Sequence, residues 1–400
     1  MTPDRLEETR TPDRVGGTTV LLTLVMAWSM LPLFTVAALA PRLGPDLGTG
    51  PAELGLAVGA GFAVAAALSP LAGRLTDRWG PRRCTVGLLV LAAVGLGLLA
   101  AAQDLVTLCL ALALSGLPQA FANPATNKAI LRSVPAERRG GVTGWKQSGV
   151  QLGALVAGVP LSLVAAWSGW RVAIAVAAAV ALLLAVWALL TLAADAPGGG
   201  ARGAGAGPPP RGPVARLAVF SLFLGVGVSS MNAHVGLFAA DELGLAPVAA
   251  GLVVAVLGVA GVLGRVLWAA RADRRGPFGL LAPLAGGAVL GPVLLVAAAW
   301  VPALVYPAAV AVGGLAVAAN AVSMIAVMTA VPGPRAGRAT ALVSAGFFAG
   351  FAVGPGVLGA LAEAAGYTYA WGWPAVALIA AGATAAPWLR RGGGEGGREA

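Results

Sequence analysis

The chain has 400 residues, of which 58% are hydrophobic and only 10% are charged, and its formal net charge is +10. A soluble domain carries roughly 25% charged residues, so most of this chain is expected to face lipid rather than water. The basic residues fall in short segments between apolar runs and do not interleave with aromatic residues. This pattern excludes a nucleic-acid-binding protein.

Twelve apolar runs are long enough to cross a hydrocarbon core of about 30 Å, which takes about 20 helical residues. The sequence therefore predicts an all-α, polytopic membrane protein. The first run has full span length and no clear cleavage site, which favours a transmembrane helix over a removable signal peptide. The expected spans are 18–40, 53–72, 84–102, 105–130, 141–166, 171–194, 215–240, 247–268, 278–299, 303–329, 338–362 and 371–389.

The segment 195–214 is rich in glycine and proline and contains GGGARGAGAGPPPRGP. Because such a stretch forms neither a helix nor a core, we expect a flexible cytoplasmic linker between an N-terminal half, 1–194, and a C-terminal half, 215–400.

The basic residues also predict the orientation of the chain. They gather in both tails, in the linker and in the segments after the even-numbered spans, where Arg265 is counted, whereas Arg42 and Arg171 lie on the opposite side. Since cytoplasmic loops carry an excess of Lys and Arg, we expect a multi-pass protein of the cytoplasmic membrane with both termini in the cytoplasm.

The two halves repeat each other at a shift of 196 or 197 residues. Asn123 falls on Asn320 and Gly169 on Gly366, and further polar and proline positions coincide. Six spans per half give both halves the same orientation, so the repeat predicts two parallel six-helix bundles about an axis along the membrane normal. Transporters are built in this way, with their binding sites near the midplane at the repeat interface.

A glycine-rich basic segment follows the second expected span. It reads Gly73-Arg74-Leu75-Thr76-Asp77-Arg78-Trp79-Gly80-Pro81-Arg82-Arg83, and its repeat, from Gly264 to Gly276, retains Asp273, Arg274 and Gly276 with extra residues before them. This segment resembles the signature loop of the major facilitator superfamily. With the twelve spans and the linker, the resemblance covers the whole chain and implies the major facilitator fold and transport by alternating access.

In that family the loop latches the two halves on the cytoplasmic side. We expect the Asp77 carboxylate at the amino-terminal end of the eleventh helix, near Gly337 to Thr340, because the helix dipole favours negative charge there. Arg78 and Arg132 are expected to neutralise it. The alternative is that the arginines only set the topology. The expected latch residues are Gly73, Asp77, Arg78, Gly80, Arg82, Arg83, Arg132, Asp273, Arg274 and Gly276.

Two further motifs bear on the mode of transport. The fifth span carries Gly149, Gly153, Gly158 and Pro160, which resemble imperfectly the Gly-Pro motif of the superfamily's antiporters. The tidier glycine spacing, with Gly346 and Gly350, lies in the eleventh span instead, which weakens a prediction of antiport. Close helix packing also explains them. The fourth-span arginine typical of many proton-coupled members is missing, so that span gives no sign of proton coupling.

Ionisable groups inside a span are functional candidates. No Asp or Glu lies deep in an expected span, and Lys146 is the one basic residue that we interpret as embedded. It could bind an anionic substrate or reach back to the cytoplasmic surface. His234, the only histidine, is either a proton relay or a buried side chain with its hydrogen bonds satisfied. Asn123 and Asn320 either face the cavity or join helices.

Aromatic side chains are expected either to form apolar cavity wall or simply to pack. The candidate substrate-binding residues are Trp28, Gln119, Asn123, Asn127, Lys146, Gln147, Gln151, Asn232, His234, Asn320, Ser323 and Phe347.

The sequence therefore predicts a transporter of a small organic solute, neutral or anionic. Multidrug efflux is the alternative, although cationic drugs would favour an acid in the cavity. A membrane enzyme would need a cluster of His, Asp, Glu or Cys, which the sequence lacks, and Cys84 and Cys109 have no metal-binding spacing. We expect no cofactor and no metal. The expected partners are the solute and the lipid bilayer, with a coupling proton left open, and the expected state is a monomer.

Overall fold

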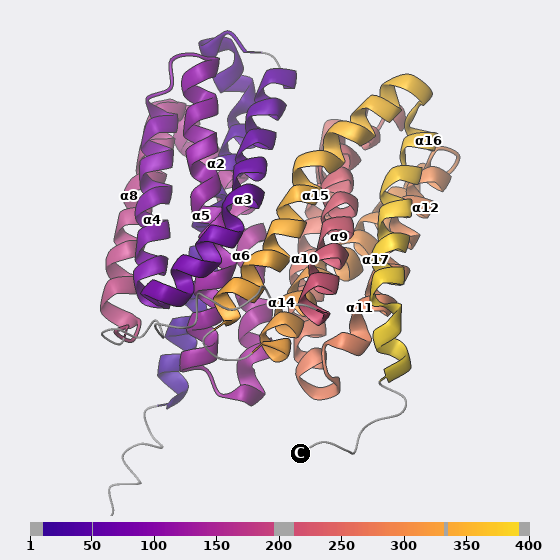
Figure 1. The fold of residues 1–400 in the computed structure, drawn as a ribbon. Helices are drawn as coiled ribbons and strands as arrows, with labels where there is room; N and C mark the ends of the chain where they lie inside the picture. The colour runs from indigo at the N-terminus through magenta and orange to yellow at the C-terminus, as the bar shows by residue number, and fades with distance from the viewer. Residues whose placement is uncertain (1–10, 50, 196–211, 332–334, 392–400) are drawn as a thin grey trace, which may run out of the picture. The chain divides into compact units, whose positions relative to one another are not determined.

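A computed structural model describes residues 11–49, 51–195, 212–331 and 335–391. These residues form helices and no strand, and twelve helices are long and apolar enough to cross a membrane (Figure 1). The all-α, twelve-span prediction is confirmed. Residues 196–211 of the expected linker lie outside the described part of the chain.

The first six spans begin with four unbroken helices, and the fifth span is divided by a π-helical turn at Pro160. They are α2 (Thr11–Leu47), α3 (Pro51–Trp79), α4 (Pro81–Ala100), α5 (Leu105–Ser133), then η2 (Ala136–Arg138), α6 (Arg139–Val156), η3 (Ala157–Leu161) and α7 (Ser162–Ser168) for the fifth span, and α8 (Trp170–Thr191).

The last six spans contain two further π-helical segments, in the seventh and the tenth span. They are α9 (Pro213–Leu237) with η4 (Phe238–Glu242), α10 (Pro247–Arg275), α11 (Phe278–Ala288) with α12 (Leu290–Ala298), then η5 (Pro302–Leu304), α13 (Val305–Ala311), η6 (Val312–Val317) and α14 (Ala318–Ala330), α15 (Ala336–Ala365), and α16 (Tyr367–Ala370) with α17 (Gly372–Arg391).

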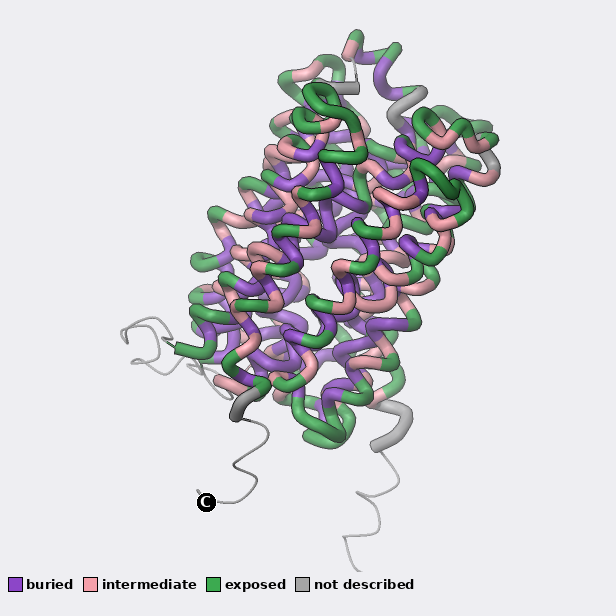
Figure 2. Tube along the Cα trace, turned by 90° about the vertical axis from the view of Figure 1, so that its right-hand side faces the viewer, coloured by how far each residue is buried: buried purple, intermediate pink, exposed green. Residues whose placement is uncertain are grey.

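The chain forms two compact units. The first consists of Met1–Val64, Leu71–Gly207 and Gly333–Arg338, and the second of Ala65–Pro70, Pro208–Pro332 and Ala339–Ala400. The start of α15 therefore belongs to the first unit. Within the first unit α2 packs on α6 and α4 on α8; within the second, α9 and α11 both pack on α17. Figure 2 shows buried and exposed residues alternating along the helices, as expected where one helix face meets protein and the other lipid.

Glycines allow the first and fifth helices of each unit to touch. A Cβ atom at Gly149 would overlap the Thr23 carbonyl oxygen of α2, and one at Gly153 would lie 2.7 Å from that of Ala27. In the second unit, Gly346 and Gly350 of α15 meet the backbone of α9 in the same way. Helix packing therefore accounts for both glycine sets, as small residues do in membrane bundles.

Backbone turns repeat between the units as well. Seven described glycines have a positive φ, and six of them form three pairs at the shift of 196 or 197 residues. These pairs are Gly48 with Gly244, Gly80 with Gly276, and Gly169 with Gly366. The repeat, first read from polar residues, is thus also present in the conformation of the main chain.

The segment expected as a loop after the second span is helical on both sides of one residue. Helix α3 continues to Trp79, α4 begins at Pro81, and Gly80 alone breaks them, with φ 91° and ψ 162°. In the repeat, α10 continues to Arg275 and Gly276 ends it. Proline fits the first turn of a helix because its missing N–H would have no intrahelical partner there. The signature segment is therefore a sharp helix–helix corner.

The fourth span begins at a capped helix terminus. Asp104, which precedes α5, accepts a hydrogen bond from the backbone N–H of Thr107 at 2.8 Å. Hydrogen bonds from the Thr107 backbone and side chain hold the pKa of the Asp104 carboxyl below its usual value. This arrangement satisfies helix donors that would otherwise lack a partner.

Candidate functional site

A polar cluster lies between the fourth and fifth spans of the first unit. The Lys146 ammonium group, in α6, is fully buried and donates to Asn127 Oδ1 at 2.7 Å and to Asn123 Oδ1 at 3.1 Å. Gln147 Nε2 donates to the same Asn123 oxygen at 3.2 Å. Amide oxygens stabilise an ammonium group without neutralising its charge. The structure therefore brings four of the expected binding residues together.

The geometry contradicts the alternative that Lys146 reaches back to the surface. Asn123 lies ten residues from the end of α5 at Ser133, about 15 Å along the helix. Lys146 lies seven residues from the start of α6 at Arg139, about 10 Å along it. Its side chain bonds to Asn123 and also to Asn127, which lies six residues from the end of α5, so the buried ammonium group stays at about the depth of its own backbone rather than at the end of the helix.

Gln119 extends this cluster along α5. Gln119, Asn123 and Asn127 are spaced four apart and therefore share one helix face. All three are buried. Gln119 Nε2 donates to the Ser115 carbonyl at 3.4 Å, whereas its Oε1 has no hydrogen-bond partner in the described structure. An unsatisfied buried acceptor is costly in a native protein, and a bound molecule with a donor group would satisfy it. Gln151, one turn beyond Gln147, is half-buried.

Trp28 and Phe347 have structural contacts. The indole N–H of Trp28, in α2, donates to the Ala177 carbonyl of α8 at 3.0 Å, so this side chain joins the first and sixth spans. The Phe347 ring packs on Phe351 with ring centres 4.7 Å apart. For both residues, packing is the role that these contacts describe.

The second unit does not repeat the cluster of the first. Asn320, the counterpart of Asn123, is buried in α14, and its carbonyl accepts from Ser323 Oγ at 2.8 Å. Asn232 is exposed on α9. The counterpart of Lys146 at the shift of 197 is Val343, an apolar residue. Repeat-related positions therefore keep the same depth but have different chemistry.

His234 joins three spans of the second unit. Its Nε2 lies 3.1 Å from the Pro355 carbonyl oxygen of α15, and its Nδ1 lies 3.2 Å from the Tyr367 hydroxyl of α16. A carbonyl only accepts, so Nε2 carries a proton, and in the neutral ring Tyr367 donates to Nδ1. Gly359 allows the approach, because a Cβ there would lie 3.4 Å from the imidazole. The hydrogen bonds of His234 are satisfied in this state.

Asp77 lies at the start of α15, at the expected helix terminus. Its carboxylate accepts from the backbone N–H groups of Gly337 at 3.0 Å and Arg338 at 2.9 Å. A Cβ at Gly337 would lie 2.6 Å from the Asp77 carboxylate and 3.0 Å from the Gly73 carbonyl, so only glycine fits there. Two backbone donors and the helix dipole together form an anion site.

The cation paired with Asp77 is Lys128, which the sequence analysis did not select. Lys128 Nζ lies 2.8 Å from Asp77 Oδ1, whereas Arg78 is exposed and Arg132 pairs with Asp195. The prediction that Arg78 and Arg132 neutralise Asp77 was therefore wrong. Lys128 lies one turn before Arg132 on the same helix, and this spacing was the signal available in the sequence.

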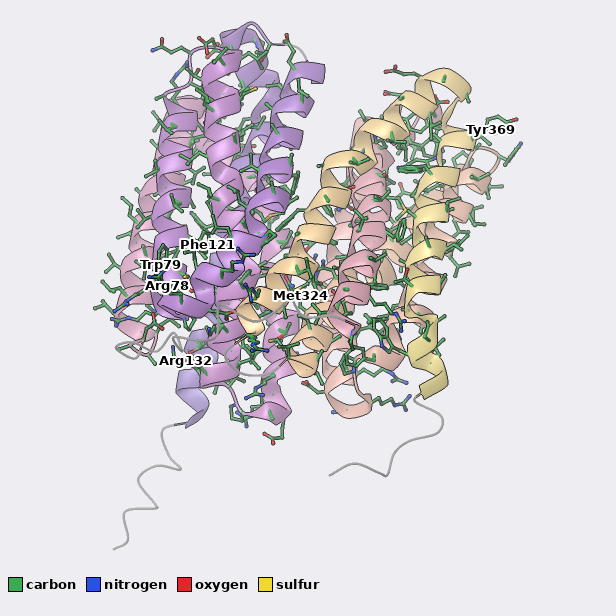
Figure 3. All side chains as sticks on the ribbon, viewed as in Figure 1. Arg78, Trp79, Phe121, Arg132, Met324 and Tyr369 are labelled. Carbon is green, nitrogen blue, oxygen red and sulfur yellow. The ribbon has the colours of Figure 1, made fainter. Side chains whose placement is uncertain are left out.

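Asp195, at the end of the sixth span, forms a second carboxylate site. It accepts from the backbone N–H groups of Arg82 at 3.4 Å and Arg83 at 2.9 Å, and from Arg132 at 2.8 Å. It thus caps α4 at the corner formed by Gly80. The Arg82 side chain donates to the Leu189 carbonyl of α8. Figure 3 shows Arg78 and Arg132 at the same end of this unit.

The repeat of the signature segment in the second unit is more exposed to solvent than the first copy. Asp273, Arg274 and Gly276 are all exposed, whereas Asp77 is buried. The structure therefore distinguishes the two copies: one carboxylate is enclosed by donors and the other faces the surface.

The sequence predicts Lys146 as the one embedded basic residue, but the structure buries a second cation. Arg265, which was counted as a loop residue, lies inside α10 and is 4% exposed. Apolar residues flank it on both sides, and this hydropathy pattern was the overlooked signal.

The sequence matches the family model described as Major Facilitator Superfamily over residues 20–317. The chain belongs to the major facilitator superfamily. This transporter has no match among curated proteins. It is similar in fold to the proton:xylose symporter XylE bound to 6-bromo-6-deoxy-D-glucose, with a TM-score of 0.79 and 15% identity over 95% of this chain and 96% of that one.

Two further solved structures share the fold. A single-residue variant of the E. coli fucose:proton symporter FucP gives a TM-score of 0.69 with 18% identity over 92% of this chain and 98% of that one. The human organic anion transporter MFSD10 (TETRAN) gives 0.71 with 16% identity over 96% and 100%. The transporter is thus a multi-pass membrane protein for small solutes, built for alternating access.

Proposed function

We propose that this transporter moves a small organic solute, with anions favoured over neutral compounds, by alternating access across the cytoplasmic membrane. The observation that carries the proposal is the buried Lys146 ammonium group held by the amide oxygens of Asn123 and Asn127. A charge inside a membrane span is expensive and marks a functional site by default.

Two features support a preference for anions. The acidic residues of the described spans lie at the span ends, such as Asp77 two residues before Trp79 and Asp273 two before Arg275. One solved relative, MFSD10, is named as an organic anion transporter. Efflux of cationic drugs, the alternative, would be better served by a carboxylate within the span.

Counterflow in proteoliposomes tests the proposal. The panel contains organic anions, their neutral amides, sugars and cationic dyes. We expect Lys146→Met to lower uptake of the preferred anion about tenfold or more and to leave a neutral solute within about twofold, because a hydrogen bond to a charged group contributes about 1.5–3 kcal/mol. Arg138→Met is the control, since it removes an exposed cation near the start of the same span.

Two results would contradict the proposal. If no solute in the panel shows counterflow with wild-type protein, the proposal that the protein transports these solute classes is wrong. If Lys146→Met and Arg138→Met carry the anion equally well, Lys146 has no part in anion recognition.

We also propose that a coupling proton, where transport uses one, is carried by His234. It contacts the seventh, eleventh and twelfth spans, and its charged neighbours Asp241 and Glu242 lie about two turns further along the seventh span. His234→Gln should then remove the dependence of uptake on an imposed pH gradient while counterflow persists. A gradient response equal to that of wild type would exclude this role.

A further inference from the structure

Arg265 is a buried cation that the latch and the Lys146 cluster leave unexplained. It lies ten residues from the end of α10 at Arg275, about 15 Å along the helix. The nearest charged residue towards that end is Arg271, six positions away and exposed. A guanidinium group removed from water carries a large solvation cost, and an ionisable group inside a span is a functional candidate by default.

The side chain of Arg265 is directed into the span rather than towards the surface. Its Nε donates to the Val317 carbonyl oxygen at 3.4 Å. Val317 lies thirteen residues from the end of α14 at Ala330, about 20 Å along that helix. Since Val317 lies well inside the tenth span, the guanidinium bonds within the helix bundle rather than at the interface.

The backbone around Arg265 is shaped for this approach. Val317 ends the π-helical segment η6, and such segments occur frequently at functional sites. A Cβ at Gly264 would lie 2.7 Å from the Gly314 carbonyl oxygen, and one at Gly313 would overlap the Leu257 carbonyl. These three glycines bring the eighth and tenth spans into backbone contact next to Arg265.

Each unit, taken by itself, has a buried cation that bonds to its fourth helix. In the first unit Lys146 contacts Asn123; in the second, Arg265 contacts Val317, three residues before Asn320. Asn123 and Asn320 are repeat-related and lie equally far, ten residues, from the ends of their helices. The two cations come from different spans, the fifth and the eighth, so the repeat alone does not explain them.

We propose that Arg265 binds a carboxylate group of the transported solute, an inference that rests on the proposed transport function. A guanidinium presents its donors in a planar fork that matches a carboxylate. It is the residue type best suited to hold an anion inside a membrane protein. The inference assigns the second unit its own recognition group for organic acids.

The test is ligand binding by purified, full-length protein in nanodiscs. Carboxylates and their neutral amides are screened by thermal shift, and the dissociation constant of the best carboxylate is then measured. We expect Arg265→Gln to weaken that carboxylate about 10- to 100-fold and to leave the matched amide within about twofold. Arg271→Gln, which removes an exposed cation from the same helix, should bind both like wild type.

A second measurement does not depend on the variant folding. Wild-type protein is treated with an arginine-modifying dicarbonyl, and modification of Arg265 is quantified by mass spectrometry. A saturating carboxylate should slow modification of Arg265 at least severalfold and leave that of Arg271 unchanged. An equal rate with and without the carboxylate, or no modification of Arg265 at all, would overturn the inference.

The two proposals fail differently. If wild type binds a carboxylate and Arg265→Gln binds it equally well, the Arg265 inference is wrong while anion transport stands. If wild type binds and transports only neutral solutes, both the anion preference and the Arg265 inference are wrong, and transport itself stands.

Discussion

At the scale of the residue, Asp77 receives three donors from two directions. Lys128 contributes a charged group, and the first turn of α15 contributes two backbone N–H groups. The carboxylate is buried, so each missing donor leaves part of its charge unsatisfied. Any rearrangement that separates Asp77 from the start of α15 must therefore replace the two backbone donors with water.

Lys128 and Arg78 can be separated by substitution. We expect Lys128→Gln to lower stability by about 1.5–3 kcal/mol, the contribution of a hydrogen bond to a charged group. Arg78→Gln should change it by less than about 0.5 kcal/mol, as substitutions of exposed side chains usually do. Thermal unfolding of the purified protein in detergent measures both. Equal losses of stability in the two variants would indicate that Arg78 also helps to neutralise Asp77.

At the scale of the element, the corner between α3 and α4 depends on one glycine. Gly80 adopts a backbone conformation that only glycine occupies readily, and its missing side chain leaves room for the Asp195 carboxylate. The repeat-related Gly276 has a similar conformation with open space around it. A substitution at Gly276 would therefore introduce backbone strain alone, whereas one at Gly80 would introduce the same strain and a clash with Asp195.

Substitution by alanine should affect the two corners unequally. Gly276→Ala should cost about 1–3 kcal/mol from strain alone. Gly80→Ala should cost more, because its Cβ would also displace Asp195 from the amino terminus of α4. Melting temperatures of the two variants give the comparison, and Asp195→Ala in the Gly80→Ala background should recover part of the loss. A smaller effect at Gly80 than at Gly276 would argue against the Asp195 cap.

At the scale of the whole molecule, the distribution of basic residues predicts which ends of the spans face the cytoplasm. Gln103 and Glu137 are exposed and flank the fourth span. In a background with Cys84→Ala and Cys109→Ala, Gln103→Cys should react with an impermeant maleimide in intact cells, and Glu137→Cys only after permeabilisation. The reverse pattern would place the termini outside.

The sequence predicts the number of spans well because span length and apolarity are local properties. The resemblance to the superfamily's signature loop predicts the place of Asp77, and the attraction between a carboxylate and the amino-terminal end of a helix is its physical reason. The sequence does not predict which cation reaches Asp77, or that Arg265 is buried. Those outcomes depend on which helix faces meet, as when Lys128 of α5 turns towards α3 and Arg265 of α10 turns towards η6.

The three pairs of positive-φ glycines have a consequence for the origin of the chain. A duplicated six-span gene would place identical turns at corresponding sites in both copies. Side chains could then diverge, as Lys146 and Val343 have done, but a left-handed turn admits almost no replacement for glycine. These glycines are therefore positions where the two copies still match after their polar side chains have diverged.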